Sequence, residues 1–320
     1  MFDIITLGSA TVDCFIDTGN KIFNPKRKTI KFPFGSKILI DKLYFYTGGG
    51  GTNSAVALSR LGFKVAFIGK IGSGDNSKFI IADLKKEKVN ADLIVKSKGR
   101  TGYSVILDAK GHDRTVLVFK GNNDDLNYNE INKTKLKCRW FYFASMIGES
   151  FKTMQKLAEY ANKNNIKILL NPSEYLAKQE NLKKVLRYTK ILVLNKEESV
   201  LISKKKEVKE RLKSLLSLGP EIVVITNGPD EINASDGVYL YKLKPRRIKI
   251  VETTGAGDAF TSGFLASYIK TNNIEQSLKI GLANSQSAIL YLGAKNKLLS
   301  WKEALEMSKK EPMVKKELLK

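Results

Sequence analysis

The sequence predicts an α/β fold: a doubly wound, mostly parallel sheet flanked by helices, with a small β lid. Three observations lead to this prediction. Short apolar runs alternate along the 320-residue chain with segments of helical periodicity. Two long segments show strand and turn character without a helix, and two glycine clusters each lie between an expected strand and an expected helix. Such alternation favours parallel strands that are covered by helices on both faces.

The elements expected for the main domain follow from these patterns, taken in chain order. Apolar runs predict strands at 3–8, 64–69, 138–144, 166–171, 190–194 and 221–226. Helical spacing of apolar residues predicts helices at 53–61, 76–87, 150–164, 206–218, 258–270 and 275–291. A β-branched run at 247–251 predicts a further strand. Because a doubly wound sheet of this size often stays in one unit, we expect a single domain over 1–320.

The lid is expected from the two helix-free segments, 14–46 and 101–120, which interrupt the alternation. The second contains the turn sequence Asp-Ala-Lys-Gly at 108–111, which is typical of a hairpin. Both segments are therefore predicted to be strands inserted into the main domain.

A small-residue turn directly before a carboxylate is the most informative motif. Gly255, Ala256 and Gly257 precede Asp258 at the expected start of a helix. Unpaired backbone N–H groups and the helix dipole at such a place bind phosphate oxygens, and residues this small let a phosphate approach the main chain. A carboxylate beside that pocket is suited to accepting a proton. The motif predicts phosphoryl transfer, with Asp258 as general base and the three N–H groups as an anion hole; an ordinary helix start with an acidic first turn is the alternative.

A second glycine cluster runs from Gly48 to Gly51, between an expected strand at 42–46 and a helix. Glycines there permit a ligand to approach the backbone closely, and Asn53 adds a donor and acceptors to the same turn.

Taken in chain order, the glycine cluster at 48–51 and the motif at 255–258 resemble the two signatures of the ribokinase-like sugar and nucleoside kinases, the PfkB carbohydrate kinase family. The resemblance spans nearly the whole chain. Gly-Ser-Ala-Thr-Val-Asp at 8–13 looks like the end of that family's first strand with its substrate-binding acid, and the glycine turn at 69–75 looks characteristic of it. Asn-Lys-Glu-Glu at 195–198 fits its Asn-x-x-Glu element, and Thr-Asn-Gly at 226–228 fits its nucleotide-side turn.

The resemblance implies ATP as phosphoryl donor, Mg²⁺ as cofactor and a sugar hydroxyl as acceptor. A nucleoside is the alternative acceptor. The substrate-binding residues it implies are Asp13, Gly48, Gly49 and Asn53. The nucleotide-binding residues are Asn195, Thr226, Gly228 and Asn284. Glu198 and Asn195, three positions apart on one side of a helical turn, would orient Mg²⁺ through water, although a helix cap also explains Asn195.

Departures from the family pattern bear on cation and substrate. Glu252 stands where members usually carry an Asp that in ribokinase helps to hold a monovalent cation, so activation by K⁺ is left open. Gly50 stands where ribokinases commonly have Lys, and the segment 144–146 lacks the acid that ribokinase offers its sugar. The acceptor would be selected by lid side chains such as Tyr103, Arg114, Phe32 and Phe34.

The net charge of +23 raises a remote alternative, a non-enzymatic basic protein that binds nucleic acid. The lysines of this sequence are spread along the chain. We therefore expect no specific nucleic-acid partner and attribute the charge to a solvated surface. Two cysteines and a single His112 supply neither a disulfide framework nor a hydrolase triad. No apolar run is long enough to span a membrane and the N-terminus does not resemble a signal peptide, so cytoplasm is expected. The resemblance implies a homodimer formed through the lid.

Overall fold

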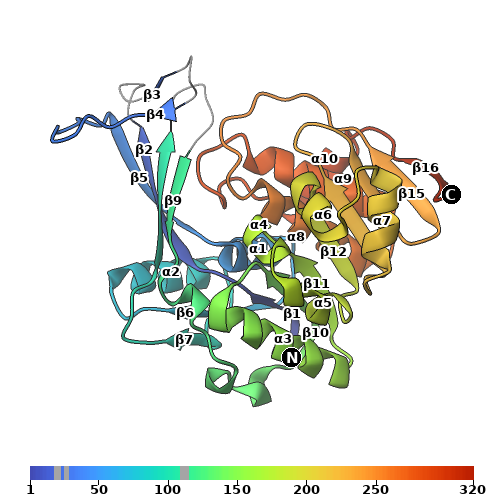
Figure 1. Ribbon diagram of the computed structural model, residues 1–320, viewed down its shortest axis with the longest axis horizontal. Coiled ribbons are helices and arrows are strands. Elements are labelled where there is room, and N and C mark those ends of the chain that lie inside the picture. Colours follow the sequence, from blue (N-terminus) through green and yellow to red (C-terminus); the bar gives the residue numbers. More distant parts are fainter. Residues whose placement is uncertain (18–22, 25–28, 109–114) are drawn as a thin grey trace.

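The computed structural model consists of a large sheet covered by helices on both faces, with a small sheet projecting from one side (Figure 1). The structure describes residues 1–17, 23–24, 29–108 and 115–320. The ten strands of the large sheet follow the order β16-β15-β14-β13-β12-β11-β10-β1-β6-β7. These neighbours confirm the predicted doubly wound arrangement, because the chain starts at β1 in the interior of the sheet and builds outward in both directions.

Seven adjacent strands of this sheet pair in parallel, as the alternation predicts. They are β1 (Phe2–Leu7), β6 (Val65–Ile71), β7 (Ile94–Lys96), β10 (Cys138–Ala144), β11 (Lys167–Asn171), β12 (Ile191–Asn195) and β13 (Ile222–Thr226). Three antiparallel strands extend it: β14 (Ile232–Ser235), β15 (Tyr239–Leu243) and β16 (Lys315–Leu318).

The helices form one layer on each face, and successive strand residues point into opposite layers. Ile4 and Tyr142 pack into the first hydrophobic cluster, whereas their neighbours Ile5 and Phe143 pack into the second. The first layer contains α1 (Gly50–Arg60), α2 (Asp75–Lys86), α8 (Ala256–Thr271), α9 (Ile274–Ala288) and α10 (Trp301–Ser308). The second contains α3 (Gly148–Lys163), α4 (Glu174–Ala177), α5 (Lys183–Leu186), α6 (Lys196–Ser203) and α7 (Val208–Leu216). Short 3₁₀ turns η1 (Gly121–Asp124), η2 (Tyr128–Glu130), η3 (Lys133–Lys135) and η4 (Glu180–Leu182) complete the connections.

The lid is a separate four-stranded sheet, as expected from the helix-free segments. Its order is β5 (Lys42–Gly48), β2 (Thr11–Asp17), β8 (Gly102–Asp108) and β9 (Thr115–Phe119), and a two-stranded ribbon joins β3 (Phe23–Asn24) to β4 (Thr29–Ile30). In Figure 1 the long strands rise beside the helical body. The turn of the predicted hairpin at 109–114, with His112 and Arg114, lies outside the described residues.

One predicted strand is wrong. Residues 247–251 form no strand; the N–H groups of Val251 and Glu252 instead donate to the carbonyl of Ile289. The run alternates basic and β-branched residues, yet Ile250 and Val251 are exposed, so burial does not favour pairing there. Among the described residues, no helix has both the length and the apolar character needed to cross a bilayer.

Candidate functional site

The parallel strands end at one edge of the sheet, where the doubly wound topology gathers polar side chains. In the strand register, Ala144 at the end of β10 lies beside Asn171 at the end of β11, and Asn195 at the end of β12 lies beside Thr226. Ligands of such folds bind outside the carboxyl ends of the strands. The four strand ends thus form the floor of a candidate site.

A cavity of about 320 Å³ opens at this edge. Five of the residues predicted from the sequence line it: Asn195, Glu198, Thr226, Gly257 and Asp258. The rest of its wall is formed by Ser9, Gly50, Lys120, Ala144, Ser145, Asn171, Pro172, Ser173, Tyr175, Val193, Leu194 and Thr261. The two glycine clusters and the Asn-x-x-Glu element therefore meet at one place, although the sequence separates them widely.

Asp258 lies in the first turn of α8, which begins after Gly255 in the left-handed region at φ 78°. The Nδ2 group of Asn53 on α1 donates a hydrogen bond of 2.9 Å to Oδ2 of Asp258. Burial raises the pKa of Asp258 to about 6, and the negative Asp13 adds to the rise, while Asn53 and the positive Lys295 oppose it. A carboxylate with this pKa is ionised at neutral pH and still able to accept a proton.

The turn at 255–257 differs in one respect from the expectation that its three successive N–H groups face a ligand. The N–H of Ala256 donates to the carbonyl of Thr253 at 3.1 Å. Within the described part of the chain, the N–H groups of Gly257 and Asp258 have no acceptor. A Cβ added to Gly257 would meet no protein atom within 4 Å, so the space beside this backbone is open.

Glu252 shapes the turn that precedes α8. It is buried, and its Oε1 accepts hydrogen bonds from the N–H of Thr254 at 2.8 Å and from the hydroxyl of Thr254 at 2.9 Å. The carboxylate that replaces the usual Asp therefore binds its own loop.

The glycine cluster at 48–51 is packed tightly against Asp13. A Cβ on Gly48 would lie 1.8 Å from Oδ2 of Asp13, and Gly49 has φ 94°, where an added Cβ would lie 2.5 Å from the carbonyl of Ser9. Asp13 is buried and accepts a hydrogen bond of 2.8 Å from Thr11; burial raises its pKa. The glycines allow the lid strand β5 to pass directly beside this carboxylate.

Asn195 and Glu198 form a reciprocal cap at the start of α6. Oδ1 of Asn195 accepts from the N–H of Glu198 at 2.8 Å, and Oε2 of Glu198 accepts from the N–H of Asn195 at 2.9 Å. Burial, Glu197 and Glu174 raise the pKa of Glu198 to about 7 against these hydrogen bonds. A cation in the adjoining cavity would offset this burial and repulsion, so the pair fits a magnesium site that uses few direct protein ligands. Three or more His, Cys, Asp or Glu side chains do not gather into a metal site anywhere among the described residues.

The remaining nucleotide-side predictions separate into two groups. Thr226 lines the cavity, and Gly228 lies just beyond it in an exposed turn with φ 54°. Asn284 is fully buried: its Nδ2 donates to the carbonyl of Ala259, and its Oδ1 accepts from the N–H of Leu299. The structure thus brings Thr226 to the cavity wall and uses Asn284 to tie α9 to α8.

Sequence reasoning missed Asn171, Lys120 and Lys295. Asn171 and Lys120 line the cavity, and Lys295 is a buried cation that acts on both Asp13 and Asp258. Asn171 could have been found, because it ends an apolar strand and precedes Pro172. In a chain with 55 Lys and Arg residues, nothing in the sequence distinguishes Lys120 or Lys295 from surface lysines.

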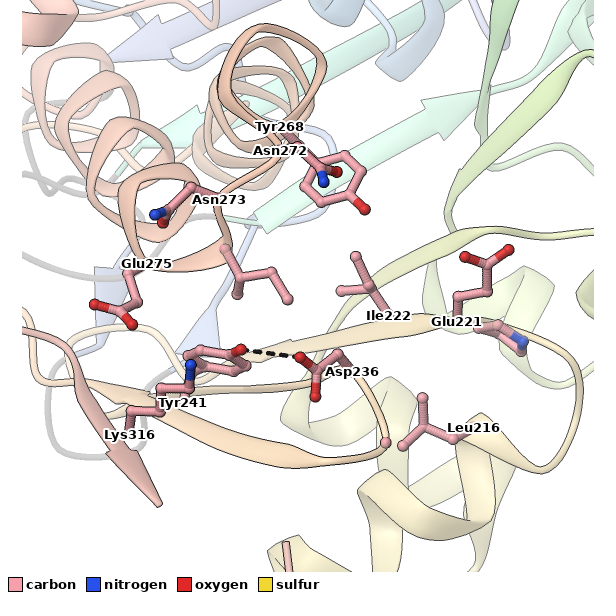
Figure 2. Close-up of a pocket in the computed structure, with 13 residues that line it drawn as sticks. Leu216, Glu221, Ile222, Asp236, Tyr241, Tyr268, Asn272, Asn273, Glu275 and Lys316 are labelled. Atoms are coloured by element: carbon pink, nitrogen blue, oxygen red, sulfur yellow. Dashed lines mark hydrogen bonds between the residues drawn. The ribbon is translucent and has the colours of Figure 1, made fainter. Parts of the chain in front are cut away.

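A larger cavity of about 660 Å³ lies near the opposite edge of the sheet, where Ile222 begins β13 and Tyr268 lies near the end of α8 (Figure 2). The hydroxyl of Tyr241 donates to Asp236 there at 2.9 Å. This cavity contains none of the predicted site residues, so the candidate site is the smaller one.

The chain is similar over most of its length to known carbohydrate kinases. Residues 3–301 match the family model described as pfkB family carbohydrate kinase. An uncharacterized sugar kinase of Archaeoglobus fulgidus is 30% identical over 251 residues, which cover 76% of this chain and 98% of that protein. Ribokinase of Bacillus subtilis is 26% identical over 313 residues, which cover 96% of this chain and 99% of that protein. The crystal structure of a ribokinase from Thermotoga maritima matches with a TM-score of 0.82 at 21% identity, covering 97% of this chain and all of that one. The chain belongs to the pfkB family of carbohydrate kinases.

Proposed function

We propose that this kinase transfers the γ-phosphoryl group of ATP to a hydroxyl of a sugar, with Asp258 as general base. The position of Asp258 carries the proposal: its half-buried carboxylate lines the cavity wall, accepts a hydrogen bond from Asn53 and directly follows the open backbone of Gly257. In the step proposed, Asp258 takes the proton of the acceptor hydroxyl, the hydroxyl oxygen bonds to the γ-phosphorus, and the bond from that phosphorus to ADP breaks.

The anion hole is proposed at the first turn of α8. Of the three residues predicted, Gly255 supplies the left-handed turn, Ala256 uses its N–H within the protein, and Gly257 keeps its N–H available. The N–H groups of Gly257 and Asp258 would stabilise charge on the moving phosphoryl group, aided by the helix dipole.

Mg²⁺ is proposed beside Glu198 and Asn195, with contact through water. When bound, the ion would neutralise charge on the ATP phosphates. Lys120, at the end of β9, adds a positive side chain to the same cavity and is a further candidate for phosphate contact. Thr226 and Gly228 would bind the nucleotide. Asn284 would contribute to nucleotide binding only by supporting α8. The Oε1 atom of Glu252 is engaged within its own turn, and dependence on K⁺ is a question for the assay below.

The acceptor is proposed to bind between the main domain and the lid face that carries Asp13, gripped by Asp13, Asn53 and the backbone of Gly48 and Gly49. By the register of the lid, Asp13 shares its face with Tyr46 and Ser104, whereas Tyr103 lies on the other face. Tyr44 and Tyr46 stack with ring centroids 6.4 Å apart on the side of Asp13. This aromatic pair favours a nucleoside as the second candidate, since a base could stack there.

A homodimer through the lid is also proposed. The face opposite Asp13 carries Phe45 on the outer strand β5 and Leu117 and Phe119 on the outer strand β9, with β2 and β8 between them, and all three are exposed in a single chain. Exposed apolar groups gathered on one sheet mark an interaction surface. We propose no specific nucleic-acid partner.

The test is an ADP-release screen of sugars and nucleosides with Mg-ATP, with and without K⁺, accompanied by thermal-shift measurements. Turnover of a sugar that disappears in Asp258→Asn supports the proposal. ATP-dependent turnover of nucleosides alone selects the second candidate. Lack of turnover with every acceptor, together with salt-resistant nucleic-acid binding, overturns the kinase assignment for this chain.

A further inference from the structure

Lys295 places a buried ammonium group in the loop between α9 and α10. Its Nζ donates to Oγ1 of Thr47 at 2.8 Å and to Oδ2 of Asp83 at 3.0 Å. The hydroxyl of Thr47 in turn donates to Oδ2 of Asp83, which closes a three-membered network. Burying a lysine is costly unless its charge is paired, and Asp83 supplies the counter-charge here.

The network joins three elements of the fold that are far apart in the sequence. Thr47 is near the end of lid strand β5, and Asp83 lies on α2. Lys295 belongs to the loop between α9 and α10, which packs on the turn at 255–257. A Cβ on Gly255 would lie 2.4 Å from Cβ of Ala294, which shows how closely that loop and the turn before α8 approach.

The loop itself is held firmly. Nη1 of Arg60 donates to the carbonyls of Lys295 and Leu298, and the same guanidinium forms a bidentate pair with Glu87. Arg60 thus anchors the main chain of Lys295 to α1, and the ammonium transmits that position to Thr47. Gly48 follows Thr47 directly and lies against Asp13.

The charge of Lys295 acts on both functional carboxylates. It lowers the pKa of Asp13 and that of Asp258, in each case against the larger effect of burial. Asp83, Asp13 and Glu87 in turn favour the charged form of Lys295, although burial lowers its pKa overall.

We propose that Lys295 is a positioning residue for the acceptor: its buried ammonium fixes Thr47, and with it Gly48 beside Asp13, and supplies positive charge behind that carboxylate. This inference rests on the proposed function, since it concerns the acceptor half of the same site. It assigns to Lys295 no contact with ATP and no proton transfer.

The first test compares Lys295→Met with Lys302→Met, which removes an exposed lysine on α10. Loss of a charge-assisted contact predicts a KM for the acceptor raised roughly ten- to a hundredfold in Lys295→Met, with KM for ATP changed less than about threefold. Lys302→Met should match the wild type. Equal changes in both KM values, or none, would overturn the proposal.

The double variant Lys295→Met/Asp83→Asn separates positioning from stability. The single change leaves Asp83 without its counter-charge, and the double change removes that unpaired charge. Melting temperature should therefore recover in the double variant while KM for the acceptor stays raised. Recovery of both would mean that Lys295 only neutralises Asp83.

Hydrogen exchange tests the positioning role of Lys295 without any measurement of turnover. Residues 42–48 should exchange faster in both Lys295 variants than in the wild type and in Lys302→Met. Faster exchange with no activity on any acceptor would retain the role of Lys295 in the lid and reject the proposed function. Unchanged exchange would reject the role of Lys295, whatever the wild-type activity.

Discussion

Asn53 and Asp258 are joined by a 2.9 Å hydrogen bond although 205 positions separate them in the sequence. The bond connects α1, at the glycine cluster 48–51, to α8, which follows the turn at Gly255. It orients Oδ2 of the proposed base toward α1, and the second oxygen, Oδ1, lies toward Gly50, whose added Cβ would be 3.5 Å away. One amide side chain therefore aligns the carboxylate and lowers its pKa against the effect of burial.

Replacing Asp258 with Asn should abolish most turnover while preserving the fold. Asn keeps the size of the side chain but cannot accept the hydroxyl proton, so kcat should fall about 10²–10⁴-fold with KM for ATP little changed. Steady-state kinetics with matched melting curves measure both quantities. A folded variant that keeps more than about a tenth of the wild-type kcat would contradict the assignment.

The pH dependence follows from the raised pKa of Asp258, about 6. The base is active when deprotonated, so kcat should fall as pH decreases through about 6. The sign for stability is the reverse of that for a salt-bridged Asp, because the folded state holds the proton more tightly than the unfolded state. The ionised carboxylate therefore costs up to ~3 kcal/mol above pH 6. Asp258→Asn lacks this cost, so its melting temperature relative to wild type should be higher at pH 8 than at pH 5. An equal difference at both pH values would exclude a raised pKa.

Glu198→Gln should weaken the response to magnesium rather than the binding of the acceptor. Gln can still accept the N–H of Asn195, so the cap at the start of α6 survives, but the carboxylate charge is lost. The Mg²⁺ concentration at half-maximal rate should rise several-fold, measured at fixed ATP. Glu197→Gln, one residue earlier on α6, is the matched control. A magnesium response equal to that of the control would leave Glu198 with its capping role alone.

The lid should mediate self-association. Phe45 and Leu117, on strands β5 and β9, are 51% and 55% exposed and lie on the face opposite Asp13. Sedimentation of the wild type should give a dimer, and Phe45→Asp or Leu117→Asp should give a monomer, because a charge cannot be buried unpaired in an apolar interface. Val238→Asp, at an exposed turn of the main sheet, should leave the dimer intact. A monomeric wild type would reject the lid interface.

Those parts of the fold that depend on local pattern could be predicted from the sequence. β10 matches the predicted range of 138–144 because its last five residues, 140–144, are apolar and buried on both faces of the sheet. β16, by contrast, is exposed and reads Lys-Lys-Glu-Leu, so only pairing with β15 makes it a strand. The segment 247–251 has the propensity but no neighbouring strand, and tertiary context decides against it.

The same division holds for the site. Three of the predicted residues lie at strand ends or helix starts, where a motif predicts a ligand site before the fold is known: Asp258, Asn195 and Thr226. Lys295 reaches its place through a loop held by Arg60 and a partner on α2, none of which is adjacent in sequence. Contacts of that kind become visible only once the chain is folded.

Gly257→Ala separates the needs of the protein from those of the ligand. The residue has helical geometry in the first turn of α8, and its added Cβ would meet no protein atom within 4 Å. Ala should therefore fold at least as well and gain about 0.5–1 kcal/mol from its lower backbone entropy in the unfolded chain. If a phosphoryl group must approach this backbone, the same methyl should obstruct it, and kcat/KM for ATP should fall at least tenfold, equivalent to about 1.4 kcal/mol. Gly74→Ala is the control: its Cβ is also unobstructed, but it lies at the start of α2 and does not line the cavity. Thermal unfolding together with kinetics distinguishes the cases, and a Gly257→Ala enzyme as active as the Gly74→Ala control would exclude phosphate contact at this turn.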